Sequence, residues 1–176
     1  MTALPEKIQF QQNGIFYRMV TTYMAAVCGL LVFRNEIQFD QSVKVGLASV
    51  EYPALEISPQ EVKDMFEAGG FNLGDTTDSL LYMLLNAAYE VCVDRYGDAS
   101  WLSLRQKHPE LEFFRHLRNA ASHGGMWNFC DDEPSRPASW RGRILSNSLQ
   151  DKRIFDANLK PGDLLVFLAD VEKLLL

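Results

Sequence analysis

The sequence predicts an all-α fold, a helical bundle with one small β-hairpin. Apolar residues recur at helical spacing along most of the chain, and residues that start or stop helices separate these runs. The chain has 176 residues, of which 47% are hydrophobic and 23% are charged, and this is the length and balance of one compact domain. We therefore expect a single domain over residues 1–176.

The N-terminal third should contain two helices followed by irregular structure. Pro5 favours a short helix that ends near Asn13, and the apolar spacing then continues as one long core helix over about 15–36. The uncharged stretch 19–33 holds 15 residues, fewer than the roughly 20 that cross a bilayer, which favours burial in a protein core. Residues 37–57 follow neither the helical nor the strand period and are expected to be irregular.

Start and stop residues predict the remaining helices. Ser58, Asp75 and Asp98 supply capping oxygens at three starts. Pro109 and Pro161 stand at the first helical position of two more helices. The expected helices cover about 59–67, 75–96, 98–107, 109–123 and 161–175.

A small hairpin is expected between the last two of these helices. Residues 138–145 and 151–155 resemble two short strands, with 146–150 as the turn that joins them. The final helix carries a wide apolar face, which is expected to close the bundle.

Charge is distributed unevenly along the chain. The net charge is −6, which argues against a protein that holds nucleic acid through the field of its whole surface. Residues 1–100 carry 6 Lys and Arg against 13 Asp and Glu, whereas residues 101–176 carry 11 against 10, and all three histidines lie within 108–123. Any anionic ligand is therefore expected to bind to the second half of the chain.

Cysteine usage and the N-terminal residues indicate a cytoplasmic protein. Cys28, Cys92 and Cys130 are far apart and form no C-x-x-C pair, so we expect neither a disulfide nor a metal site. Cys28 and Cys92 lie in apolar runs, where thiols act as small hydrophobic groups. The first residues lack the basic region and apolar run of a secretory signal, and we expect no association with a membrane.

The helix expected over 109–123 carries the concentrated functional chemistry of the chain. Polar side chains recur at i, i+4, i+7 and i+8 and share one face, namely Arg115, Asn119, Ser122 and His123. Arg118 and His123 are five residues apart, about 140° around an ideal helix, so one helix does not aim both side chains at one point. In a two-fold dimer the same patch meets itself, and two helix ends then pool these groups in one cleft.

These groups suit the cleavage of RNA by its own 2′-hydroxyl. An imidazole takes or gives a proton near neutral pH, and a guanidinium holds a phosphate through two parallel hydrogen bonds, so no metal or other cofactor is required. The alternative is structural, because cationic side chains are also favoured in the last turn of a helix, where they offset the helix dipole. Spacing alone favours this structural alternative.

The segment also resembles the motif of a protein superfamily. An arginine is followed by a polar residue and, after three more residues, by a histidine, in the string Arg118-Asn119-Ala120-Ala121-Ser122-His123. This pattern resembles that of the HEPN superfamily, the nucleotide-binding domains of higher eukaryotes and prokaryotes, whose motif lies at a helix end late in a helical bundle. The two glycines after the motif, a tryptophan-bearing hairpin and a closing helix from Pro161 resemble a bacterial, plasmid-borne HEPN subfamily.

The resemblance implies a metal-independent endoribonuclease that works as a homodimer, typically as a toxin or as an effector of defence against phage. It implies that Arg118 steadies the phosphate, that Asn119 orients the reacting groups and that His123 acts in proton transfer. Some HEPN proteins are inactive and bind a nucleotidyltransferase instead. The partners to consider are therefore RNA, a second copy of the chain, and an antitoxin or a nucleotidyltransferase. A purely structural helical protein is the third alternative.

Two further groups of residues are candidates for contacts with the substrate. Arg115, His116 and Ser122 adjoin the motif and are predicted to extend the phosphate contacts, although an isolated basic residue on a helix is more often only solvated. A basic stretch around Trp140 is predicted either as an RNA-facing edge or as an exposed strand that its charges keep soluble. Its cations are Arg136, Arg141, Arg143, Lys152 and Arg153.

Overall fold

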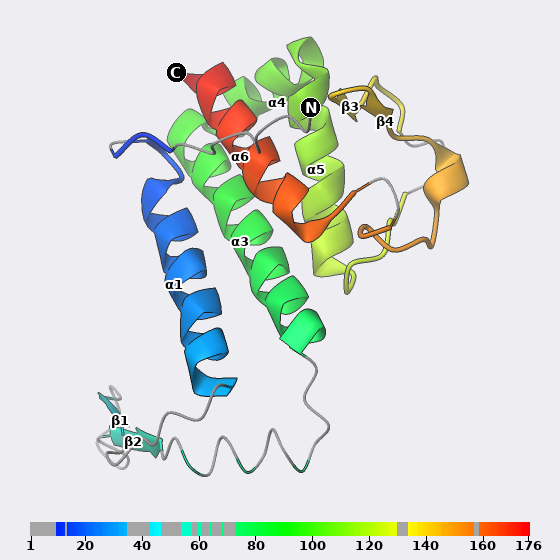
Figure 1. Cartoon of the computed structure of the whole chain (residues 1–176). Coiled ribbons are helices and arrows are strands. Elements are labelled where there is room, and N and C mark those ends of the chain that lie inside the picture. Colours follow the sequence, from blue (N-terminus) through cyan, green and yellow to red (C-terminus); the bar gives the residue numbers. More distant parts are fainter. Residues whose placement is uncertain are drawn as a thin grey trace, which may run out of the picture. The chain divides into compact units, whose positions relative to one another are not determined.

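The computed structural model shows a mostly helical chain, in agreement with the predicted all-α class (Figure 1). The chain divides into two compact units, one made of Met1–Tyr23 and Asp78–Leu176 and the other of Met24–Thr77. The structure describes residues 10–12, 14–34, 43–46, 54–57, 60, 64, 68, 73–129, 134–156 and 159–176.

Four helices form most of the first unit and lie close to their predicted positions. α3 (Leu73–Tyr96) begins two residues before its expected start. α5 (Pro109–Ser122) and α6 (Pro161–Leu175) begin at the prolines that predicted them. α4 (Asp98–Lys107) also begins at the expected place, but its N-cap is Gly97 and no side-chain hydrogen bond caps it, so Asp98 is not the predicted cap. Start and stop residues therefore placed these helices to within two residues.

The first long helix is confirmed with slightly different bounds. α1 (Tyr17–Arg34) begins two residues later than expected. Residues 10–12 are not helical, and the rest of the short helix expected after Pro5 lies outside the described residues. Among the described helices, none combines the length and the apolar character that crossing a membrane requires.

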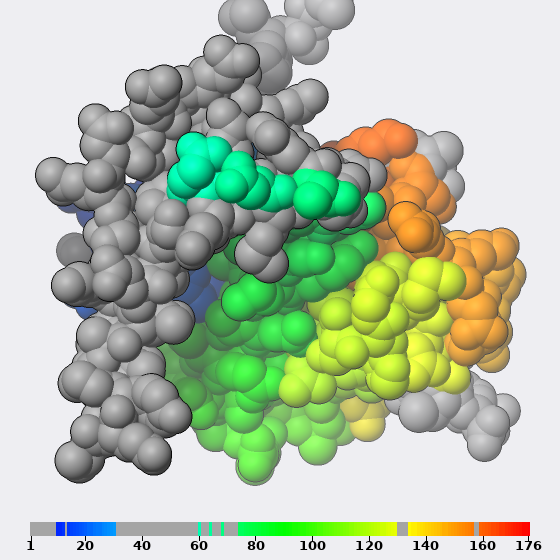
Figure 2. Space-filling model, turned by 90° about the horizontal axis from the view of Figure 1, so that it is seen from below, coloured from blue at the N-terminus to red at the C-terminus, as the bar shows by residue number. Residues whose placement is uncertain are grey.

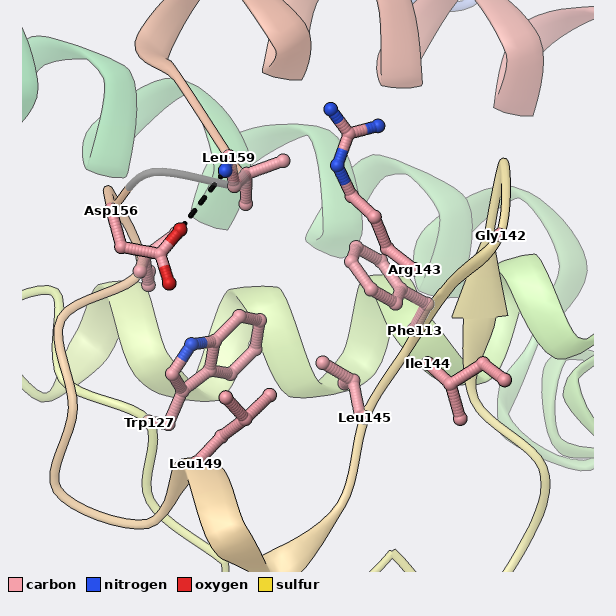
Figure 3. A pocket seen from close by; sticks show the side chains of 10 residues that line it. Phe113, Trp127, Gly142, Arg143, Ile144, Leu145, Leu149, Asp156 and Leu159 are labelled. Carbon is pink, nitrogen blue, oxygen red and sulfur yellow. Dashed lines mark hydrogen bonds between the residues drawn. The ribbon is translucent and has the colours of Figure 1, made fainter.

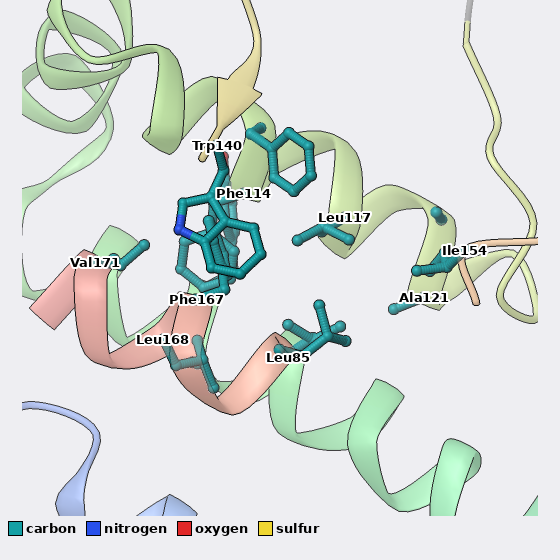
Figure 4. Packing of buried hydrophobic residues seen from close by; sticks show 14 of the residues in the cluster. Leu85, Phe114, Leu117, Ala121, Trp140, Ile154, Phe167, Leu168 and Val171 are labelled. Carbon is teal, nitrogen blue, oxygen red and sulfur yellow. The ribbon is translucent and has the colours of Figure 1, made fainter. Parts of the chain in front are cut away.

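An aromatic cluster holds α3, α5 and α6 together. Phe114 of α5 is fully buried, and its ring centroid lies 5.3 Å from that of Tyr89 on α3 and 5.4 Å from that of Phe167 on α6. Trp140 of the hairpin packs on Phe167 at 5.3 Å (Figure 4). Each fully buried side chain of this size stabilises the fold by roughly 1.5–3 kcal/mol. The apolar face of α5 packs into this core, with Leu111, Phe114, Leu117 and Ala121 all buried.

A buried carboxylate on α6 holds the start of α1. Glu172 is 2% exposed and accepts hydrogen bonds from the N–H groups of Phe16 at 3.0 Å and Gln11 at 3.4 Å. The first turn of α1 contains no acidic residue, so Glu172 supplies the negative charge that a helix N-terminus favours. Gly14 leaves the necessary space, because a Cβ there would overlap the carboxylate.

The second unit contains a hairpin where irregular structure was predicted. β1 (Val43–Gly46) pairs antiparallel with β2 (Ala54–Ile57), and Val45 stands opposite Leu55 in the register. The prediction for 37–57 was therefore wrong at these strands, because each is only four residues long and shows too few alternations to reveal a period of two.

The helix expected over 59–67 is described only in part. Gln60 and Asp64 are helical, and the Nε2 of Gln60 donates a hydrogen bond to the Oδ1 of Asp64 at 2.7 Å. Ala68 is also helical. The rest of that segment lies outside the described residues.

The second hairpin exists, but its turn is not where the sequence predicted it. β3 (Ser139–Trp140) pairs with β4 (Arg143–Ile144) through a two-residue turn at Arg141 and Gly142, whose φ values are 43° and 78°. Both central residues of a type I′ turn need positive φ, and Arg-Gly is not the usual Asn-Gly signal for it. The expected turn over 146–150 instead contains the 3₁₀-helix η1 (Asn147–Leu149).

Both described cysteines are free. Cys92 is fully buried, and burial raises the pKa of its thiol to about 12, so the thiol stays neutral in the core as a small hydrophobic group. Cys28 is exposed, contrary to the expected role in a core. Cys130 lies outside the described residues.

Candidate active site at the end of helix α5

Two glycines end α5 and present His123 to solvent. The N–H of His123 donates to the carbonyls of Asn119 at 3.1 Å and Ala120 at 3.0 Å, and the residue caps the helix. Gly124 and Gly125 follow with φ values of 67° and 80°. The N–H of Gly125 donates to the carbonyl of Ala120 at 2.9 Å, as in a Schellman motif. Because His123 is exposed, its imidazole is accessible to a ligand.

Gly125 also lets the turn pack directly against α3. A Cβ on Gly125 would overlap the hydroxyl and ring of Tyr82, whereas a Cβ on Gly124 would meet no atom within 4 Å. The ring of Tyr82 stacks on that of Phe155, with centroids 5.6 Å apart and planes 11° from parallel. These contacts fix the position of the motif's end relative to α3.

Arg118 is engaged by an acidic residue of α3. Its Nη2 donates to the Oε1 of Glu90 at 2.7 Å, and its guanidinium carbon lies 5.7 Å from the ring centroid of Tyr89. The side chains of Arg118 and Glu90 are 37% and 52% exposed. Water reaches this ion pair, so it contributes at most about 1 kcal/mol to stability. An incoming phosphate can therefore replace Glu90 at small cost.

Ser122 repeats this arrangement one helical turn later. Its Oγ donates to the Oδ1 of Asn86 on α3 at 2.8 Å. Asn86 and Glu90 are four residues apart on α3, as Arg118 and Ser122 are on α5, so two polar contacts join antiparallel helices. Asn119 is partly buried beside them. Figure 2 shows the end of α5, in yellow-green, at the surface next to α3, in green.

Arg115 and His116 belong to a separate, buried cluster. The carboxylate of Glu112 is 2% exposed and accepts hydrogen bonds from Arg115 at 2.8 Å and from Arg105 of α4 at 3.2 Å. His116 is 1% exposed, and its ring packs against Phe129 with centroids 5.2 Å apart. The predicted contact of His116 with substrate does not fit this structure, because a buried ring offers no surface to a phosphate. Arg115 pairs with Glu112 of its own helix, and it is Arg105 that links α4 to α5 through the same carboxylate.

Two arginines of the basic stretch fasten the hairpin to α6. Their guanidinium carbons lie 5.5 Å (Arg141) and 4.9 Å (Arg143) from the Trp140 ring centroid. Arg141 pairs with Asp170 at 2.7 Å and Arg143 pairs with Asp163 at 3.1 Å. The indole N–H of Trp140 also donates to Asp170, at 2.9 Å. Two of the five cations of the basic stretch therefore have acidic partners on α6 in this structure.

Glu90 and Asn86 are the site residues that the sequence interpretation missed. They lie within an apolar helical run, and their i, i+4 spacing matches the spacing of Arg118 and Ser122. This matched spacing was the one available signal. It was not decisive, because the sequence does not show which helix packs against α5. For the same reason the sequence grouped Arg115 with Ser122, although the structure turns Arg115 toward Glu112.

A cavity lies away from the motif, between α5 and the hairpin. Its volume is about 560 Å³, and Phe113, Trp127 and Leu145 line it together with Arg143 and Asp156 (Figure 3). The carboxylate of Asp156 accepts a hydrogen bond from the N–H of Leu159 at 3.0 Å. No residue of the segment 118–123 lines this cavity, so it is not part of the candidate site.

The comparisons with other proteins identify no relative. No protein-family model, curated protein sequence or solved structure matches this chain. In the part of the chain that the structure describes, no three His, Cys, Asp or Glu side chains are grouped so that they can hold a metal ion. A function is therefore inferred from the end of α5 alone.

Proposed function

We propose that this chain is a HEPN-type endoribonuclease, which cleaves RNA without a metal ion and acts as a homodimeric toxin or defence effector. One observation carries the proposal. The Arg-polar-x-x-x-His motif stands at the exposed end of α5, where both Arg118 and His123 reach solvent. If the residues at this helix end served only as caps, the contact between the guanidinium of Arg118 and Glu90 of α3 would have no role.

Arg118 supplies the contact with the phosphate. Its exposed ion pair with Glu90 holds the guanidinium over Tyr89 in the absence of substrate. A phosphate offers two oxygens to the planar guanidinium, and charge-assisted bidentate pairs of this kind are stronger than a single exposed contact. Substrate therefore replaces Glu90, and the guanidinium stabilises the charge that develops on the phosphate.

His123 supplies proton transfer. A base removes the proton of the RNA 2′-hydroxyl, the oxygen attacks the adjacent phosphorus, and the bond to the 5′-oxygen breaks as that oxygen gains a proton. The products are a 2′,3′-cyclic phosphate and a 5′-hydroxyl. In the proposed dimer, His123 of one protomer takes the first proton and the partner subunit's His123 returns one to the leaving oxygen.

A second function is favoured by one specific contact. Glu90 already satisfies Arg118, which suits a catalytically inactive module that uses the same face to bind a nucleotidyltransferase or another defence protein. Such a module binds its partner without cleaving RNA. Activity of the purified chain separates the two functions.

The decisive experiment compares His123→Ala with the unchanged protein in a cleavage assay that contains EDTA. We expect cleavage by the unchanged protein and its loss in the variant, with unchanged melting temperatures, because His123 is exposed and its side chain makes no core contact. His108→Ala is the matched control, since His108 stands at the opposite end of α5. Equal cleavage by His123→Ala, or a requirement for divalent metal, would contradict the proposal.

A further inference from the structure

We propose that Lys152 and Arg153 bind the RNA backbone beside the candidate active site, holding phosphates of single-stranded RNA next to the bond that is cleaved. This inference rests on the proposed ribonuclease function and adds the surface that retains its substrate. Both side chains are exposed, and they are far from the motif in the sequence.

A backbone ladder brings these two residues to the end of α5. The N–H of Trp127 donates to the carbonyl of Lys152, and the N–H of Ile154 donates to the carbonyl of Gly125, both at 2.8 Å. Arg153 forms a β-bridge with Met126. In Figure 2 the orange atoms of this segment adjoin the yellow-green atoms at the end of α5.

The ladder limits the distance from Arg153 to His123. Gly125 is two residues after His123, and Ile154 is next to Arg153. Consecutive Cα atoms are 3.8 Å apart and those of a hydrogen-bonded antiparallel pair are about 5.5 Å apart, so the Cα atoms of Arg153 and His123 are at most about 17 Å apart. Across such a separation, the side chains of Arg153 and His123 can contact neighbouring phosphates of one RNA strand.

The two residues that directly follow the cations, Ile154 and Phe155, anchor this segment to the core and to α3. Ile154 is 1% exposed in the core, and Phe155 stacks on Tyr82 of α3. The backbone of Arg153 is therefore fixed relative to the motif, while its side chain extends into solvent. A rigid backbone of this kind lowers the ordering cost of binding.

Among the described residues, no acidic side chain pairs with Lys152 or Arg153. In the described part of the chain, neither Lys152 nor Arg153 has a carboxylate within 4 Å. The flanking Asp151 accepts a hydrogen bond from Gln150 at 2.8 Å, and Asp156 accepts one from the N–H of Leu159 at 3.0 Å. Arg141 and Arg143 pair with α6, whereas these two cations have no acidic partner among the described residues and can meet an external anion.

RNA phosphates match this arrangement in charge and in spacing. Cations that contact phosphates position a nucleic acid without reading its sequence, and their contribution falls as salt rises. A single strand is the form whose backbone can bend to place a 2′-hydroxyl in line with the bond that breaks. The two cations thus supply affinity and orientation, whereas the motif supplies chemistry.

The test measures binding of a short single-stranded RNA that is 2′-O-methylated throughout and therefore cannot be cleaved by its own hydroxyls. Fluorescence anisotropy gives its affinity for the unchanged protein and for the double variant Lys152→Ala with Arg153→Ala, between about 50 and 200 mM salt. We expect the slope of log affinity against log salt to become shallower by about 1.4, from about 0.7 for each lost contact with a single strand. The matched control is Arg95→Ala with Lys107→Ala, which removes two exposed charges away from the motif.

The outcomes separate this proposal from the proposed function. An unchanged slope in the Lys152 and Arg153 variant, or an equal change in the control, overturns the inference even if unmodified RNA is cleaved. A shallower slope in that variant alone supports it. Absence of cleavage of unmodified RNA by the unchanged protein would overturn the ribonuclease function and leave the binding surface standing.

Discussion

The guanidinium of Arg118 shows how a single side chain can be held in place and still be available. Its ion pair with Glu90 spans two helices, yet 37% of the arginine side chain remains exposed. Exposed pairs of this kind are worth at most about 1 kcal/mol. Glu90 therefore orients the guanidinium N–H groups of Arg118 but binds them only weakly.

Arg118→Lys tests whether the planar group matters. An ammonium cannot make the two parallel hydrogen bonds of a guanidinium, so we expect RNA cleavage to fall at least tenfold, about 1.4 kcal/mol of transition-state stabilisation. The melting temperature should change little, because the pair with Glu90 is exposed. Cleavage rates and thermal unfolding measure both effects, and Arg95→Lys on α3 is the control. A large loss of stability with unchanged cleavage would assign Arg118 a structural role.

Asp170 gives a prediction about pH. Burial raises its pKa, but hydrogen bonds from Arg141 and Trp140 and the charges of Arg141 and Lys173 lower it by a larger amount. The pKa of Asp170 therefore lies below its usual value. A carboxyl with a depressed pKa stabilises the fold above its unfolded pKa of about 3.9, and this stabilisation is lost as the pH falls through the folded pKa.

Asp170→Asn should therefore lower the free energy of unfolding at neutral pH, and the difference from the unchanged protein should shrink as the pH falls below about 3.9. Urea unfolding of both proteins at neutral and acidic pH measures this difference. The same destabilisation at both pH values would show that the charge of Asp170 does not hold the hairpin on α6.

At the scale of elements, the turn after α5 depends on two glycines for different reasons. Both have positive φ, so alanine at either position costs roughly 1–2 kcal/mol. Only a Cβ on Gly125 also overlaps Tyr82. Gly125→Ala should therefore lower the free energy of unfolding more than Gly124→Ala does, as urea unfolding of the two variants can show. Equal losses would mean that the contact with Tyr82 is unimportant.

The helices were predictable because their signals are local. Proline stands at the first helical position of both α5 and α6, and two glycines follow the last turn of α5, so these limits are set without reference to the rest of the chain. The first hairpin was not predictable, since β1 and β2 are only four residues long. The second hairpin was predicted, but its turn was misplaced because the turn at Arg141 depends on an unusual residue in the left-handed region. Short strands are specified by the elements they pair with rather than by their own period.

The candidate site was predictable only where it is contiguous. The motif from Arg118 to His123 is one segment, and the sequence places it at a helix end. The contact with Glu90 and the burial of His116 depend on which surfaces α3 and α4 present to α5. The proximity of Arg153 depends in turn on a ladder between residues far apart in the chain.

At the scale of the whole molecule, the proposed ribonuclease requires two protomers. The exposed surface of α3 beside the site includes Met83, which is 67% exposed, and Ala87 and Glu90 at helical spacing from it. A large exposed apolar side chain next to a half-site suits a two-fold contact between copies of the chain.

Met83→Glu should therefore convert a dimer into a monomer and abolish cleavage while the helical circular dichroism is retained. Sedimentation at micromolar concentration reports the oligomeric state. Leu102→Glu, on an apolar side chain of α4 that is 38% exposed, should remain a dimer and is the control. An unchanged protein that sediments as a monomer and cleaves RNA at full rate would contradict a site shared by two subunits.

The most direct test of the proposed chemistry uses a DNA oligonucleotide that contains one ribonucleotide, incubated with the unchanged protein in EDTA. We expect one cut, immediately after the ribonucleotide, with a 2′,3′-cyclic phosphate on one product and a 5′-hydroxyl on the other, and no cut by His123→Ala. Cleavage at deoxynucleotides, products ending in a 3′-hydroxyl, or the same cut by His123→Ala would contradict the proposed chemistry.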